Sequence, residues 1–142
     1  MSTEKNLKVE EGEFIVHNDL SPTKYKGDFP FFIHNVPGRS LRMTTAFQGD
    51  STPLGAKFED LDILIHLNED PLGTYQIPGD GSSLLRYRRD GVTVTGVGSL
   101  TLTQLDDERK QCIGTLTFDV FSNKLHGDFN IFGTSGRLTK LS

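Results

Sequence analysis

The chain has 142 residues, a formal net charge of −4, one cysteine and no tryptophan. This length is typical of one domain, and it allows roughly two thirds of the unfolded surface to be buried on folding. The acidic balance argues against a general nucleic-acid binder, which needs a basic face. One cysteine excludes an internal disulfide, and the Cys/His spacing of a zinc site is missing.

The first eleven residues are polar, and we expect them to form a loose segment ahead of a single β domain over residues 12–142. Charged residues from Lys8 to Glu13 interrupt any apolar stretch long enough for a secretory signal. No segment approaches the roughly 20 apolar residues of a membrane helix. We therefore expect no membrane insertion and, if this is the whole natural product, a cytoplasmic location. The alternative is a mature secreted form whose signal has been removed, which would have the same sequence features.

Alternation of apolar and polar residues dominates the rest of the chain. In "LDILIHL", Leu61, Ile63 and Ile65 share one side of a strand and Asp62 lies on the other. Similar runs predict strands near residues 13–17, 28–34, 41–48, 61–67, 74–77, 84–89, 92–104, 112–121, 125–132 and 136–141. Many short strands at close spacing predict an all-β domain, a single antiparallel β-sandwich or barrel-like fold with at most one short helix.

Two local sequences refine this prediction. Asp90-Gly91 separates two strand patterns and predicts a type I′ hairpin turn. The segment "TPLGAKFEDL" at 52–61 has the composition of one helical turn or a short helix, with Ser51 or Thr52 as its cap, although Pro53 and Gly55 weaken that prediction.

The tripeptide Gly-Asp-Phe occurs twice, at 27–29 and at 127–129, and each copy lies beside an aromatic-rich strand. Pro30 follows the first copy and Asn130 the second, so the flanking sequences differ at once. Proline inside a strand pattern places the first copy at an edge or a strand start. We interpret the two copies as a shared strand idiom rather than as a duplicated binding motif.

The order of the strand patterns resembles that of the uncharacterised all-β lipoprotein-type domains of Bacteroidetes. The resemblance rests on "GTY" at 73–75, "GSLTLT" at 98–103 and "GTLTF" at 114–118, within the C-terminal two thirds of the chain. It implies a β-sandwich-like fold, assigns no activity and transfers no functional residues. The signal and the lipobox cysteine of that family are missing from the start of this chain.

Few residues suggest catalysis or metal binding. The four histidines, His17, His34, His66 and His126, have no ligand-like local spacing, so we predict no metal site and no cofactor. Cys112 shares a strand face with apolar residues, and we predict that it is buried and unreactive. We interpret the acidic clusters at 59–62, 69–70 and 106–108 as solvated loops.

Arg86 and Arg88 are the most site-like residues of the sequence. They are two residues apart in a predicted strand, so they point to one face while Tyr87 points to the other. With Arg42 from a neighbouring strand they would suit a small anionic ligand. The alternative is that cross-strand carboxylates satisfy the arginines without a ligand; the candidates are Asp62, Asp119 and Asp128.

Strong sheet patterning without converging catalytic residues favours a non-catalytic binding or assembly module over an enzyme. The alternative is an enzyme whose site is assembled from distant strands in a barrel or sheet cavity. Ile113, Phe121 and Phe132 make the C-terminal strands apolar on both faces. A second layer often covers such strands, so the sequence also suggests a homo-oligomer.

Overall fold

The structure is a computed structural model that describes residues 12–48, 52–79 and 83–135. These ranges contain strands and turns and no helix. The strands are β1 (Glu13–Asn18), β2 (Lys24–Lys26), β3 (Asp28–Asn35), β4 (Ser40–Gln48), β5 (Phe58–His66), β6 (Gly73–Ile77), β7 (Leu84–Arg89), β8 (Val92–Thr95), β9 (Val97–Asp106), β10 (Gln111–Val120) and β11 (Asn123–Ser135).

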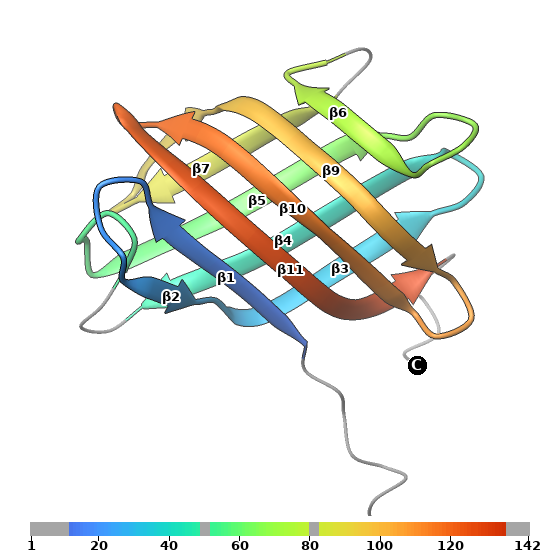
Figure 1. Cartoon of the computed structure of the whole chain (residues 1–142), viewed down its shortest axis with the longest axis horizontal. Coiled ribbons are helices and arrows are strands. Elements are labelled where there is room, and N and C mark those ends of the chain that lie inside the picture. Colours follow the sequence, from blue (N-terminus) through green and yellow to red (C-terminus); the bar gives the residue numbers. More distant parts are fainter. Residues whose placement is uncertain (1–11, 49–51, 80–82, 136–142) are drawn as a thin grey trace, which may run out of the picture.

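Nine strands follow one hydrogen-bonded path in the order β6-β9-β10-β11-β3-β4-β5-β7-β8. Strand β1 lies off this path, where it pairs with β11 and β2. Figure 1 shows β1, β11, β10 and β9 crossing diagonally in front of β3, β4, β5 and β7. The sheet therefore curls over itself into an open half-barrel, with a front layer and a rear layer.

The all-β class is confirmed, but the sheet is mixed and not purely antiparallel. Strand β11 pairs antiparallel with β1 along its first half and then parallel with β3 over residues 133–135. A Cβ atom at Gly133 would lie 2.0 Å from the carbonyl oxygen of Phe32, so only glycine permits this close crossing. Alternation of apolar and polar residues predicts the face of the sheet on which a side chain lies. It does not predict the direction of a strand relative to its neighbour, so the parallel pair was not predicted.

The predicted strand at 92–104 is two strands, β8 in the rear layer and β9 in the front layer, joined at Gly96. The Gly96 N–H donates to the carbonyl oxygen of Leu85 at 2.8 Å. A Cβ atom at Gly96 would lie 2.7 Å from a methyl carbon of Leu85, so a glycine lets the chain turn this corner. Strand β2 was not predicted, and the predicted strand at 136–141 lies outside the described residues.

The hairpin prediction is confirmed. Asp90 and Gly91 join β7 to β8 with φ angles of 49° and 85°, both in the left-handed region that a type I′ turn requires. The short helix predicted as possible at 52–61 is absent. A turn takes its place, in which the Gly55 N–H donates to the Thr52 carbonyl oxygen at 3.2 Å, and β5 begins at Phe58.

One hydrophobic cluster fills the space between the two layers. Its largest fully buried side chains include Tyr87, Phe14, Phe32, Phe47 and Phe118. The predicted alternation is confirmed on β5, where Leu61, Ile63 and Ile65 are buried, and on β7, where Tyr87 is buried between exposed Arg86 and Arg88. The space between the two layers is therefore occupied by side chains.

Candidate binding groove on the outer face of the rear layer

Strands β4, β5 and β7 bring the three predicted arginines together. Strand β5 lies between the other two, and its register sets Asp62 opposite Arg86 and Asp60 opposite Arg88. On the other side of β5, Arg42 of β4 is two residues from the position that faces Asp62. Because alternate residues share a face, all five side chains lie on the outer face of the rear layer.

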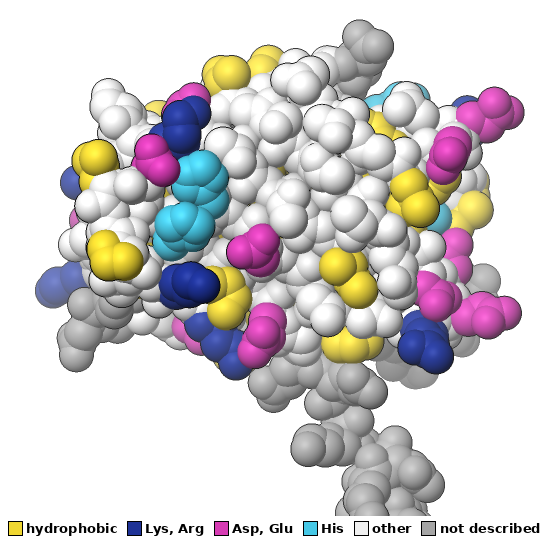
Figure 2. All heavy atoms as spheres, in the orientation of Figure 1, with side chains coloured by type: hydrophobic (Ala, Val, Ile, Leu, Met, Phe, Trp, Pro, Cys, Tyr) yellow, Lys and Arg dark blue, Asp and Glu magenta, His cyan; other side chains and the backbone are white. Residues whose placement is uncertain are grey.

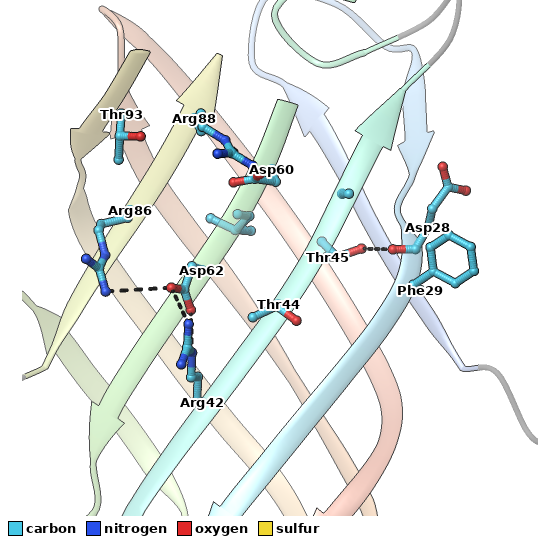
Figure 3. A pocket seen from close by; sticks show the side chains of 12 residues that line it. Asp28, Phe29, Arg42, Thr44, Thr45, Asp60, Asp62, Arg86, Arg88 and Thr93 are labelled. Atoms are coloured by element: carbon cyan, nitrogen blue, oxygen red, sulfur yellow. Dashed lines mark hydrogen bonds and ion pairs between the residues drawn. The ribbon is translucent and has the colours of Figure 1, made fainter. Parts of the chain in front are cut away.

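Asp62 lies between two of the arginines (Figure 3). Arg42 donates from Nε to Oδ1 and from Nη2 to Oδ2 of Asp62, both at 3.0 Å. This bidentate hydrogen bond and the negative charge of Asp62 raise the pKa of Arg42. Arg86 reaches the same carboxylate only as an ion pair, with Nη2 3.7 Å from Oδ2. Arg86 makes no hydrogen bond to any other side chain in the described part of the chain.

Arg88 is held by a different carboxylate. Its Nε and Nη2 both donate to Oδ2 of Asp60, the first at 3.0 Å. Its guanidinium carbon also lies 5.4 Å from the ring centroid of Phe58, within cation–π range. Arg88 is therefore fixed in place by β5.

These side chains line a hollow of about 540 Å³, which we call the arginine groove. Thr44 and Thr93 add hydroxyl groups to its wall. Asp28 and Phe29 border it on the side away from Arg86, as Figure 3 shows. The groove holds three guanidinium groups (Arg42, Arg86 and Arg88) and three carboxylates (Asp28, Asp60 and Asp62), so its formal charges balance.

Of the three predicted cross-strand carboxylates, only Asp62 contacts the arginines. Asp119 pairs with Lys124 instead (3.3 Å), and Asp128 lies on β11 in the front layer. Asp60 was not predicted as a partner, although its spacing of two from Asp62 matches the spacing of Arg88 from Arg86. Matching these spacings across two strand patterns was the signal that could have found it.

The inner face of the same strands carries a buried carboxylate. Glu59 has no solvent exposure and accepts hydrogen bonds from the backbone N–H groups of Leu54 and Ala56 and from the Thr52 hydroxyl. The Tyr87 hydroxyl donates to Oε1 of Glu59. Burial, with this hydrogen bond and the charge of Glu59, raises the pKa of the Tyr87 phenol.

The structure corrects the prediction that residues 59–62 form a solvated acidic loop. Glu59 is buried, and Asp60 and Asp62 lie on the outer face of β5. The Glu59 carboxylate draws the N–H groups of residues 54 and 56 into one cluster. This gives the physical reason for a turn where a short helix was allowed.

Two histidines meet on the outer face of the front layer. The His17 and His126 rings stack with centroids 4.9 Å apart, and Nε2 of His126 lies 3.0 Å from Asp19. In Figure 2, histidine side chains (cyan) lie next to one another on this face, among basic and acidic side chains. His34 lies apart from them, 2.7 Å from Asp107. Among the described residues, no three His, Cys, Asp or Glu side chains gather as a metal site requires.

Cys112 is fully buried, as predicted, and burial raises the pKa of its thiol to about 12. A thiol in this state has little thiolate at neutral pH and no solvent contact. The parts of the chain that the structure describes contain no helix long and apolar enough to cross a membrane.

Comparisons of the chain with protein-family models, with curated proteins and with solved structures gave no match. The resemblance to the all-β domains of Bacteroidetes therefore stays a prediction.

Proposed function

We propose that the protein is a non-catalytic binding module that holds a carboxylate-bearing ligand in the arginine groove. The observation that carries this proposal is the unequal engagement of the three guanidinium groups. Arg42 and Arg88 are hydrogen-bonded to carboxylates of β5, whereas Arg86 is half exposed and has only a 3.7 Å ion pair. Its planar fork of donors is therefore the part of the groove that a ligand would satisfy.

The charge of the groove indicates the kind of anion. The carboxylates of Asp28, Asp60 and Asp62 offset the three arginines, so a doubly charged phosphate would gain little from the local field. A singly charged carboxylate matches the two-donor edge of Arg86 at a lower electrostatic cost. Thr44 and Thr93 line the groove on its β4 and β8 sides, and their hydroxyl groups would donate further hydrogen bonds.

The state of the acidic residues supports binding over catalysis. A general acid or base needs a carboxylate that is free to exchange a proton with its substrate. Of the three carboxylates of the groove, Asp60 and Asp62 are engaged by arginines and only Asp28 has no ion pair with a described residue. Glu59 is surrounded by donors on the far side of the sheet. The described side chains of the hydrophobic cluster also occupy the space between the layers, where a site assembled from distant strands would otherwise lie.

A thermal-shift titration tests the proposal. Acetate, succinate and inorganic phosphate would be added to the wild type, to Arg86→Ala and to Arg109→Ala at constant ionic strength. Arg109 is the matched control because it is an exposed arginine whose ion pair with Asp106 is long, at 4.0 Å. We expect a carboxylate to raise the Tm of the wild type and of Arg109→Ala, since a ligand of the native state stabilises it by mass action.

The same carboxylate should leave the Tm of Arg86→Ala unchanged, and Arg86→Ala/Arg88→Ala should behave likewise. In 0.5 M NaCl the shift should shrink, because salt screens exposed charges. The proposal is wrong if no carboxylate stabilises the wild type more than Arg86→Ala. Equal stabilisation of all three proteins would indicate a general salt effect.

A further inference from the structure

A second hollow, of about 940 Å³, opens where β1 and β2 separate from β3 beside the end of β11. Its apolar wall consists of Phe29, Pro30, Phe31 and Phe132, and we call it the apolar cleft. Aromatic residues are enriched at protein–protein contact surfaces, and exposed apolar patches often mark such surfaces.

Phe29 is the unusual residue of this cleft. Its side chain is 83% exposed, and its φ of 52° is a conformation that bulky residues adopt only at a cost. The pairing of β3 with β4 shifts between Asp28 and Phe31, which turns residue 29 out of the sheet. Figure 3 shows the Phe29 ring beside Asp28, at the margin of the rear layer.

The second Gly-Asp-Phe shows how differently the same tripeptide is used. Phe129 lies inside β11, is 3% exposed and stacks on Phe14 with ring centroids 5.5 Å apart. The aromatic ring of the first copy therefore remains outside the core, although the second copy shows that this tripeptide can place its ring inside.

The cleft also carries one charge of each sign. Lys26 and Asp28 both line it, on either side of Gly27. Lys26 has only a long, exposed ion pair with Glu13, at 3.8 Å. Asp28 makes no ion pair with another residue of the described chain. The cleft therefore combines apolar side chains with one basic and one acidic side chain in a single surface patch.

We propose that the apolar cleft is the contact surface of a symmetric homodimer, in which Phe29 of each subunit enters the cleft of the other. A two-fold contact needs a patch that is complementary to itself. Here the projecting ring and the hollow lie side by side, and the patch carries both Lys26 and Asp28. Two-fold apposition sets Lys26 of one subunit against Asp28 of the other, which favours a second copy over an unrelated partner.

This dimer gives a location to the self-association predicted from the sequence. That prediction rested in part on Phe132, which lines the cleft. The dimer does not depend on the carboxylate ligand. Although Phe29 and Asp28 also border the arginine groove, Arg86 is not part of the cleft.

Sedimentation velocity over a range of concentrations tests the contact. We expect the wild type to dimerise and Phe29→Asn to lose more than about thirtyfold in dimer affinity, as removal of a central aromatic anchor does. Asparagine tolerates a positive φ, so this variant keeps the local backbone. The matched control is Leu20→Asn, which removes another exposed apolar side chain (87% exposed) from the turn between β1 and β2.

Charge reversal tests the orientation. Lys26→Asp alone and Asp28→Lys alone should each be monomeric, because like charges then meet across the two-fold axis. An equimolar mixture of the two variants should recover a heterodimer, because opposite charges meet again at both contacts. Arg86→Ala should dimerise like the wild type, which separates this result from the ligand test.

A wild type that stays monomeric overturns the proposal, and the cleft would then be a site for another kind of partner. A dimer that survives Phe29→Asn overturns it as well, because the contact would lie elsewhere. Two charge variants that fail to combine would contradict the proposed two-fold arrangement.

Discussion

Strands β5 and β7 hold two carboxylate sites back to back, and the sites differ in how completely their donors are used. On the inner face, Glu59 accepts from two backbone N–H groups and from the Thr52 and Tyr87 hydroxyls, with no solvent exposure. On the outer face, Asp62 accepts hydrogen bonds from Arg42, whereas Arg86 contacts it only through a 3.7 Å ion pair.

The difference separates structural polar groups from groups available for binding. A buried carboxylate must have partners because an unsatisfied charge in the interior is very costly. An exposed guanidinium can keep unused donors because water satisfies them until a ligand arrives. The inner site should therefore control folding stability, and the outer site should control ligand binding.

The largest effect should come from Glu59→Ala. This change leaves the Leu54 N–H, the Ala56 N–H and the buried Tyr87 hydroxyl without their acceptor. Each such group costs about 1–3 kcal/mol, so we expect the free energy of unfolding to fall by about 3 kcal/mol or more. Denaturant unfolding measures this free energy. The matched control is Asp60→Ala on the outer face, whose free energy of unfolding should fall by about 1 kcal/mol or less. Equal losses in the two variants would contradict the comparison.

Alkaline pH should weaken the inner site next. The pKa of Tyr87 is raised from its ordinary value of 10.0 in the folded state, so above pH 10 the unfolded chain releases a proton that the folded chain keeps. Stability is then fully present below pH 10 and falls by about 1.4 kcal/mol for each further pH unit.

The Cys112 thiol, whose pKa is raised to about 12, also lowers the free energy of unfolding from about pH 9 upward. It does so in the wild type and in Tyr87→Phe alike, so the comparison of these two proteins isolates the effect of Tyr87. The slope of unfolding free energy against pH should be shallower in the variant above pH 10. Parallel curves for the two proteins would show that Tyr87 ionises normally in the folded chain.

The smallest effect should follow Arg42→Ala. The Arg42 side chain is about half exposed, and exposed ion pairs contribute at most about 1 kcal/mol even with good geometry. The difference in unfolding free energy from the wild type should shrink further in 1 M NaCl. A salt-independent loss of several kcal/mol would mean that the outer face is as structural as the inner one.

Strand periodicity predicted the faces of the sheet but not its connections. It placed Arg86 and Arg88 opposite Tyr87, and it named Asp62 as a partner, because side-chain direction in a strand depends only on odd and even positions. Glu59 has the same parity as Leu61 and Ile63, and applying the rule to it would have predicted its burial.

The sequence could not predict contacts that depend on how distant strands meet. The parallel pairing of β11 with β3 joins residues about 100 positions apart, and no local pattern encodes it. The outward turn of Phe29 depends on a register shift between β3 and β4. The amino-acid sequence around Phe29 does not show where the pairing of two strands shifts.

The most direct test of the central claim is a titration of the protein with acetate, followed by the NMR signals of the arginine side-chain Nε–H groups. If the arginine groove binds a carboxylate, the Arg86 signal should move along a saturating curve, with smaller shifts for Arg42 and Arg88. The Arg109 signal should stay in place. An Arg86 signal that does not move, or that drifts linearly together with that of Arg109, would contradict the account.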